Sequence, residues 1–396
     1  MPIHPERWKS LLDRYKDDKP RKMLALDGGG IRGLITLGIL QEIEALIKEK
    51  TGQELCEYFD YIAGTSTGAI IAASLARGMN TADLVQFYTD YGREMFDPSA
   101  LIERYKFLHS ADPLILQLQK VFGSTTTLDP DGLKCLLLVV TKNVTTDSAW
   151  PVSSNPDAKY NDPGRSDCNL RVPLWKLVRA STAAPVYFPA EVMTWNQGNP
   201  SDATVFVDGG VTPYNNPAFL LFRMATEPAY RLSWSTGEKN LLLISIGTGA
   251  AESLGATAAA PNKNIVSTVA ELPGALMYAM QVDQDIACRT IGRCTYGPPL
   301  DRELLDLVPR ESREGMTLKE CYAAPPVPLD QNLGRRFLYA RYNADLSREG
   351  LSAMGFSEVD PEKIQKMDCP DNIPTLLKIG QAASAKVQPE HFGSFL

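Results

Sequence analysis

Short runs dominated by apolar residues constrain the fold of this chain more than any other feature of its sequence. Four of them stand far apart, at Met23–Leu26, Cys135–Val140, Thr204–Val207 and Leu241–Ile246. Residues 34–50, which follow the first run, place apolar side chains at helical spacing. Continuously apolar strands are buried on both faces, as in a mostly parallel sheet covered by helices. The sequence therefore predicts a three-layer α/β/α fold.

Composition shifts divide the chain into three predicted parts. Residues 1–20 predict an N-terminal helical extension, and residues 21–250 the α/β domain. The segment 250–264 consists mainly of small residues and marks a boundary. Residues 251–396 predict a mostly helical C-terminal extension packed on the α/β domain, interrupted by prolines at 323–328. The stretches 143–170 and 195–203 predict surface loops.

Charge and cysteine content narrow the class of protein. The formal net charge of −7 disfavours a nucleic-acid polymer as partner. The seven cysteines are scattered without C-x-x-C spacing, which is typical of reduced thiols in a cytoplasm and not of a zinc site. No apolar run approaches the roughly 18 residues of a membrane span. We therefore expect a cytoplasmic protein whose contact with a membrane is peripheral.

Three glycine-containing motifs each follow a strand-like run. DGGGIRG occupies 27–33, GTSTG occupies 64–68 and DGG occupies 208–210. In open α/β sheets, ligands bind beyond the carboxyl ends of the strands. The shared placement of the motifs predicts one site at that edge.

Ser66 lies at the centre of a Gly-x-Ser-x-Gly turn between a strand and a helix, which is how a serine nucleophile is usually presented. Gly64 and Gly68 would let neighbouring backbones approach beside it. The alternative is that Ser66 only caps the helix.

The base that would activate Ser66 is not an obvious histidine. Among the three histidines, His391 alone completes a Ser–Asp–His order, but it lies five positions before the last residue, where we expect a frayed segment. A carboxylate can act as base when partial burial raises its pKa toward neutrality. Asp208 is the best placed carboxylate, although an aspartate before two glycines also forms turns.

The glycine loop has two interpretations. Gly28, Gly30 and Gly33 match the G-x-G-x-x-G pattern of dinucleotide sites, but the next strand ends in GTSTG instead of the expected acidic residue. Alternatively, the N–H groups of Gly28, Gly29 and Gly30 form an oxyanion hole. Arg32 would add positive charge there, or form an ordinary surface ion pair.

Taken together, the motifs resemble those of the patatin-like phospholipase family: a D-G-G-G-x-[KR]-G loop, a G-x-S-x-G elbow and a D-G-[GA] motif, in this order. The runs RASTAAPVYF at 179–188 and NNP at 215–217 extend the resemblance over residues 20–250. It implies a lipid acyl hydrolase of the phospholipase A type with a Ser66–Asp208 dyad. The same resemblance implies an oxyanion hole at Gly28–Gly30 with Arg32, and a structural role for Asp27.

The resemblance also implies partners. Substrates would be membrane glycerophospholipids at the bilayer surface, with neither a metal nor another cofactor. Some bacterial members are antiphage effectors switched on by cyclic nucleotides, which makes a cyclic-nucleotide activator a hypothesis here, as is a homo-oligomer. Alternatives are a non-phospholipid carboxylesterase or thioesterase, and a lipid- or nucleotide-binding module without catalysis.

Residues 272–293 suggest a further helix, with Leu276, Ala279, Met280 and Ile286 on one side. We expect this stripe to pack on the protein's own core, and a lipid-facing lid is the alternative. A set of arginines nearby suggests either scattered surface charge or a regulatory anion site: Arg289, Arg293, Arg302, Arg310 and Arg313.

Overall fold

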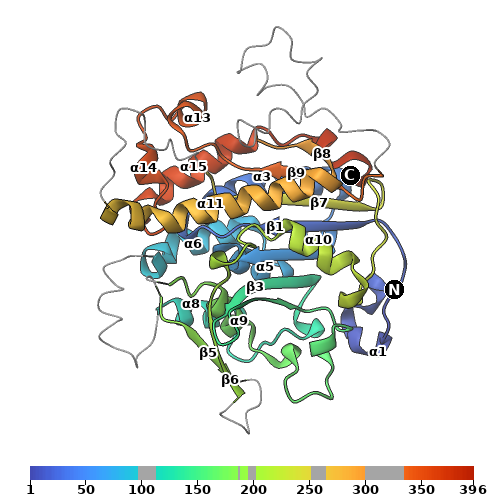
Figure 1. Cartoon of the computed structure of the whole chain (residues 1–396). Helices are drawn as coiled ribbons and strands as arrows, with labels where there is room; N and C mark the ends of the chain where they lie inside the picture. Colours follow the sequence, from blue (N-terminus) through green and yellow to red (C-terminus); the bar gives the residue numbers. More distant parts are fainter. Residues whose placement is uncertain (97–112, 186–187, 195–201, 251–264, 299–333) are drawn as a thin grey trace.

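A nine-stranded sheet with helices on both faces forms the centre of the molecule (Figure 1). The computed structural model describes residues 1–396 except 97–112, 186–187, 195–201, 251–264 and 299–333. The strand order is β5-β6-β3-β2-β1-β7-β9-β8, and β4 pairs with β3. The predicted three-layer α/β/α fold with a mostly parallel sheet is confirmed.

Most strands of the sheet are parallel to their neighbours. The parallel strands are β1 (Arg21–Leu26), β2 (Tyr61–Thr65), β3 (Leu136–Asn143), β7 (Leu241–Ile246), β8 (Arg293–Tyr296) and β9 (Leu338–Tyr342). Antiparallel pairing brings in β4 (Ser148–Ser153), β5 (Glu191–Thr194) and β6 (Ala203–Asp208) at one end of the sheet.

Each face of the sheet has its own hydrophobic core, because successive side chains of a strand point to opposite faces. Leu24 and Leu26 of β1 pack in one core, whereas Met23 and Ala25 pack in the other. The first core is covered by α3 (Gly33–Thr51), α5 (Thr67–Ala76), α6 (Thr81–Phe96), α8 (Pro113–Phe122), α9 (Leu174–Ser181) and α15 (Ile373–Ser384).

The second core is covered by α10 (Ala218–Thr226), by α11 (Ile265–Ile291) and by the N-terminal residues. The remaining short helices are α1 (Pro5–Trp8), α2 (Leu12–Tyr15), α4 (Leu55–Tyr58), α13 (Arg348–Ala353) and α14 (Pro361–Ile364). No helix in the described ranges is both long enough and apolar enough to cross a membrane.

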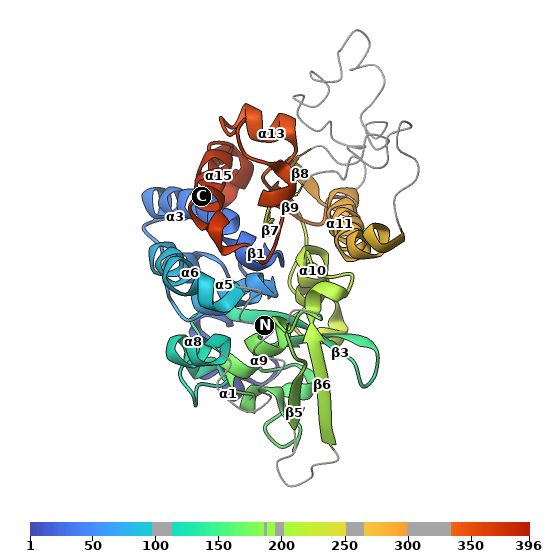
Figure 2. The ribbon, with the colours of Figure 1, turned by 90° about the vertical axis from the view of Figure 1, so that its left-hand side faces the viewer.

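The sheet continues beyond the boundary that the sequence suggests at residue 250. Strand β9 pairs with β7, and β8 pairs with β9, so the C-terminal part contributes to the same sheet as the motifs. Helix α15 packs along α3 (Figure 2), where Gly380 lies so close to the Ile35 backbone that a side chain would collide with it. The predicted proline interruption at 323–328 lies outside the described residues.

Two local predictions are wrong. The predicted surface loop 143–170 contains β4, which pairs with β3 from Leu138↔Ser153 to Asn143↔Ser148. His391 is not in a frayed segment: it is 9% exposed, and its Nδ1 lies 2.8 Å from the Tyr342 hydroxyl.

The apolar stripe of α11 differs from the expectation as well. Leu276 is 54% exposed, whereas Gln284, Asp285 and Cys288 face the interior. Of the nearby arginines, Arg289 pairs with Asp285 and Arg293 pairs with Glu238. Arg302, Arg310 and Arg313 lie outside the described residues.

The helical extension predicted for residues 1–20 consists of three short pieces: α1, the 3₁₀ helix Lys9–Leu11, and α2. They are attached through the buried carboxylate of Asp157, which accepts hydrogen bonds from the backbone N–H groups of Ile3 (2.7 Å) and His4 (2.9 Å). The Trp8 indole Nε1 donates to the same carboxylate at 2.9 Å. Trp8 is 1% exposed, so its N–H depends on this acceptor.

We expect Asp157→Ala to lower the free energy of unfolding by roughly 2 kcal/mol, because it leaves the buried Trp8 N–H without an acceptor. Lys9→Gln is the matched control in the same segment: Lys9 forms an exposed ion pair with Asp129, and its loss should cost less than about 1 kcal/mol. Urea unfolding measures both. Equal losses in the two variants would contradict this account of the attachment.

Candidate active site

Ser66 occupies a sharp turn between β2 and α5. Its backbone φ of 54° lies in a region that residues other than glycine rarely adopt. The flanking glycines are required by close packing: a Cβ on Gly64 would collide with the Gly68 carbonyl, and one on Gly68 would collide with the Leu26 carbonyl. The turn thus holds Ser66 in a strained conformation, with its side chain at the edge of the sheet.

Asp208 is the hydrogen-bond partner of this serine. The Ser66 Oγ donates to Asp208 Oδ2 at 2.6 Å, and the second carboxylate oxygen accepts from the Gly210 N–H at 2.6 Å. Asp208 is 4% exposed, whereas Ser66 is partly exposed. The carboxylate is therefore fixed in place and contacts the serine.

Strand β6 delivers Asp208 from an unexpected direction. It runs antiparallel to β3 and pairs only with the last residues of that strand, with Asp208 opposite Thr141. On β3, the adjacent Val140 pairs with Thr65, the residue before Ser66. An aspartate on an antiparallel strand thus arrives at the same edge of the sheet as the ends of the parallel strands.

Burial raises the pKa of Asp208 to about 6, although hydrogen bonds from Ser66 and Gly210 and the charge of Arg179 oppose this rise. A carboxylate with a pKa near neutrality can be ionised at physiological pH and still accept a proton effectively. A carboxylate with this pKa, in contact with Ser66, can act as a base toward the serine hydroxyl.

Ser181, at the end of α9, supports the turn from behind. Its Oγ accepts from the Ser66 N–H at 2.9 Å and donates to the Val140 carbonyl at 2.6 Å. No role for Ser181 is predicted from its position within the RASTAAPVYF run. A serine in a helix gives no local signal that it contacts a turn 115 residues earlier.

The glycine loop lies directly against Ser66, since a Cβ on Gly28 would be 3.2 Å from the Ser66 Cβ. The Gly28 N–H already donates to the Asn215 carbonyl at 3.1 Å, so the expected role of Gly28 as an oxyanion donor does not fit this arrangement. The N–H groups of Gly29 and Gly30 have no acceptor among the described residues. These two amides remain available to a ligand.

Arg32 contacts the backbone of the site. Its guanidinium donates to the Gly249 carbonyl at 3.2 Å and is 3.5 Å from the Gly29 carbonyl, and burial lowers its pKa to about 10. In this structure it links the glycine loop to the end of β7 and forms no ion pair among the described residues.

His391 takes no part in the dyad. Its ring stacks on Tyr296, with centroids 4.7 Å apart, and it bonds to Tyr342, beside β8 and β9. The Ser–Asp–His alternative is therefore not supported by the geometry, in which the hydroxyl of Ser66 is directed at Asp208.

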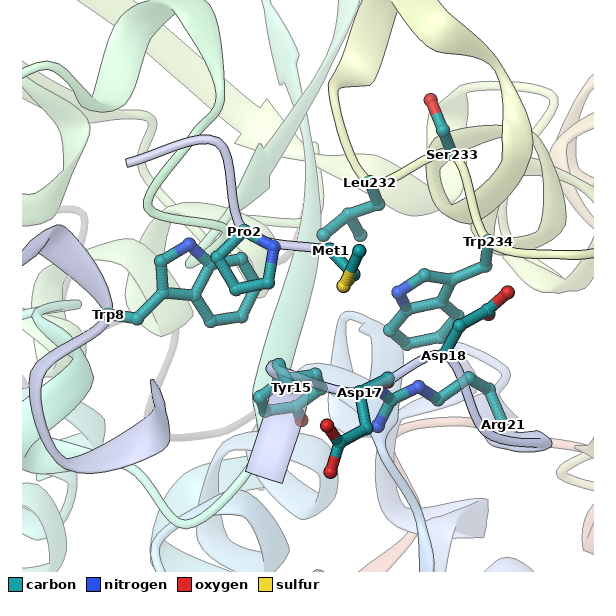
Figure 3. Close-up of a pocket in the computed structure, with 10 residues that line it drawn as sticks. All are labelled: Met1, Pro2, Trp8, Tyr15, Asp17, Asp18, Arg21, Leu232, Ser233 and Trp234. Atoms are coloured by element: carbon teal, nitrogen blue, oxygen red, sulfur yellow. The ribbon is translucent and has the colours of Figure 1, made fainter. Parts of the chain in front are cut away.

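A cavity of about 190 Å³ (Figure 3) lies near the beginning of β1. The glycine loop follows the other end of this strand. Trp8, Tyr15 and Trp234 form aromatic walls. The guanidinium of Arg21 lies 5.1 Å from the Tyr15 ring centroid and 5.5 Å from that of Trp234. None of the predicted site residues lines this cavity, so we do not place the active site there.

Known proteins share sequence with the part of the chain that contains Ser66 and Asp208. The family model for patatin-like phospholipase matches residues 24–222. Patatin-17 of Solanum cardiophyllum is 31% identical over 243 residues, covering 57% of this chain and 60% of the relative. A cGAMP-activated phospholipase of Vibrio cholerae is 30% identical over 225 residues, covering 52% of this chain and 59% of the relative.

The chain belongs to the patatin-like phospholipase family. Its match spans about three fifths of the length of the curated relatives. Among solved structures, human GIVD cytosolic phospholipase A2 in complex with methyl gamma-linolenyl fluorophosphonate gives a TM-score of 0.47 at 11% identity, covering 100% of this chain and 63% of that chain.

We expect Asp208→Asn to stabilise the protein at pH 8 by up to about 3 kcal/mol. The carboxylate has a pKa of about 6 in the folded protein and about 3.9 in the unfolded chain. Between these values the folded state binds more protons, so the penalty of the buried charge grows as pH rises through this window and is complete above it. Asparagine removes the charge.

Urea unfolding of the wild type and Asp208→Asn from pH 4 to pH 8 measures this difference, and contributions from other groups cancel. The gain should shrink toward zero as pH falls to 4. Asp13→Asn, at a side chain that is 93% exposed, serves as a control without a buried charge. A gain in Asp208→Asn that does not vary with pH would contradict the assignment.

Proposed function

We propose that the protein is a lipid acyl hydrolase of the phospholipase A type, which cleaves fatty-acyl esters of membrane glycerophospholipids through an acyl-enzyme on Ser66. The observation that carries this proposal is the 2.6 Å hydrogen bond from Ser66 Oγ to the buried carboxylate of Asp208. Membership of the family supports the lipid substrate class.

In the proposed first step, the Ser66 hydroxyl transfers its proton to Asp208 as its oxygen attacks the ester carbonyl. The N–H groups of Gly29 and Gly30 stabilise the negative oxygen of the tetrahedral intermediate. The C–O bond to the glycerol then breaks, and the lysophospholipid leaves with the proton from Asp208. The fatty acyl group remains as an ester on Ser66.

In the second step, Asp208 accepts a proton from water, and the water oxygen attacks the acyl-enzyme. When the intermediate collapses, the Ser66 oxygen takes the proton back from Asp208 and the fatty acid is released. The carboxylate thus acts once as base and once as acid in each half of the reaction.

An exposed apolar side chain near the dyad, and another on the helix that packs beside it, support approach from a lipid surface. Val211, three residues after Asp208, is 40% exposed, and α11, whose Leu276 is 54% exposed, packs against the 3₁₀ helix Gly209–Val211. Exposed apolar groups beside a reactive site favour contact with acyl chains. We expect peripheral binding to the bilayer from the cytoplasmic side.

We expect the wild type to release fatty acid from phosphatidylcholine–phosphatidylglycerol vesicles, with the rate falling as pH drops below about 6, because protonated Asp208 cannot act as base. Ser66→Ala and Asp208→Asn should each lower the rate by at least ~1,000-fold. His391→Ala, outside the dyad, should retain most of the activity at a temperature where it remains folded.

Full activity in Asp208→Asn, or a loss in folded His391→Ala as large as that in Ser66→Ala, would contradict the mechanism. Hydrolysis of soluble esters or thioesters without release from vesicles would favour the carboxylesterase or thioesterase alternative. Binding to vesicles without any hydrolysis would favour a lipid-binding module.

A cyclic nucleotide is our proposed activator, by analogy with the relative that is named a cGAMP-activated phospholipase. We expect fatty-acid release to rise at least tenfold on adding one member of a panel of cyclic di- and trinucleotides that includes cGAMP. Linear dinucleotides are the control. A rate that no cyclic nucleotide changes would contradict this regulation and leave the hydrolase proposal intact.

A further inference from the structure

Asp27, the residue that follows β1, forms a buried ion pair with Arg341 of β9, a strand that is not adjacent to β1. Arg341 of β9 donates through Nη1 to Asp27 Oδ1 at 2.8 Å and through Nη2 to Asp27 Oδ2. Asp27 is completely buried, and Arg341 is 3% exposed. Strand β7 lies between β1 and β9, and its Ser245 accepts from Arg341 Nη1 at 2.7 Å, so the guanidinium reaches across β7.

This geometry depends on the planar fork of arginine. Two parallel N–H bonds to a carboxylate fix its orientation as well as its position, which a lysine ammonium cannot do. Burial raises the pKa of Asp27, and the charge and hydrogen bonds of Arg341 oppose the rise. The pair is therefore a rigid connection between β9 and the first residue of the glycine loop.

The rest of the glycine loop is held by the same region of the chain. Thr248 Oγ1 donates to the Gly28 carbonyl at 3.0 Å, and the Met367 carbonyl accepts from the Ile31 N–H at 2.9 Å. These contacts fix the loop on both sides of Gly29 and Gly30. Together with Arg341, they all come from residues beyond the span 24–222 that matches the family.

We propose that Arg341 is a positioning residue for catalysis, which acts through Asp27 to align the Gly29 and Gly30 amides with the oxygen of the reacting ester. This inference rests on the proposed hydrolase function. Arg341 itself does not touch the substrate. Its contribution is to fix donors that stabilise charge developing in the transition state, and such donors act only when they are already aligned.

The test compares Arg341→Lys with Arg21→Lys, using p-nitrophenyl butyrate as a soluble ester. Arg21 begins β1, the strand that leads into Asp27; it is 4% exposed and lies 3.4 Å from the buried carboxylate of Asp60. Both variants replace a buried arginine that pairs with a buried carboxylate, but only Arg341 contacts the glycine loop. Thermal unfolding measures the structural cost of each change.

We expect Arg341→Lys to lower kcat roughly 10- to 100-fold, less than complete removal of an oxyanion donor because the amides are misaligned and not lost, with KM changed less than about threefold. Arg21→Lys should keep kcat within about twofold at a temperature where both variants are folded. Asp27→Asn, which keeps the shape of the side chain and loses its charge, should reproduce the loss in kcat. It also tests the contact if Arg341→Lys does not fold.

A kcat within twofold of the wild type in folded Arg341→Lys, or in folded Asp27→Asn if the first variant does not fold, would overturn the proposal. So would equal losses of kcat in Arg341→Lys and Arg21→Lys, since these would report a general structural role. Failure of the proposed function gives a different pattern: the wild type and Ser66→Ala would be equally inactive on the ester, and this inference would fail with it.

Discussion

The hydrogen bond between Ser66 and Asp208 joins residues 142 positions apart, and the arrangement of the sheet serves to form it. Ser66 is placed by a strained turn that two glycines make sterically feasible. Asp208 arrives on an antiparallel strand that pairs with only the end of β3. Ser181 connects the Ser66 turn to β3, the strand with which β6 pairs, by binding both the Ser66 amide and the Val140 carbonyl. A change in any of these elements alters the distance across which a proton would move.

Burial of Asp208 has opposite effects on stability and on chemistry. Taking the carboxylate out of water destabilises its charged form, which raises its pKa to about 6. The same shift makes it a stronger proton acceptor than an exposed aspartate. The unusual backbone conformation of Ser66 represents a second local cost at the site, since strain of this kind persists only where the surrounding structure enforces it. The two hydrophobic cores, one on each face of the sheet, supply the stability that offsets these local costs.

The parts of the fold and site that could be predicted from sequence are those set by local chemistry. Continuous apolar runs identified β1, β3 and β7, because a strand buried on both faces has few polar side chains. Strand β9 did not follow this rule, since its sequence LYARY contains a charged residue, Arg341. That arginine is compatible with burial only because Asp27, 314 residues earlier, neutralises it.

The direction of a strand and the use of a backbone amide were also hidden in the sequence. Nothing local indicates that β6 is antiparallel, because its residues would suit either direction. Whether the Gly28 N–H is available depends on the carbonyl of Asn215, which the fold brings to it from 187 positions away. The motif thus indicates three adjacent glycine amides. Only the tertiary structure shows that the Gly28 amide already donates a hydrogen bond, whereas those of Gly29 and Gly30 have no acceptor among the described residues.

The order of the strands means that the residues matching the family model do not include all the strands that β1 pairs with. Strand β1 is hydrogen-bonded on one side to β2 and on the other to β7, which begins at Leu241, beyond the matched span 24–222. A fragment limited to that span would keep only residues 24–26 of β1 and leave them without β7 on one side, an apolar unpaired edge of the kind that promotes aggregation. The residues that carry the chemical signature are therefore fewer than those required to make a soluble, folded unit.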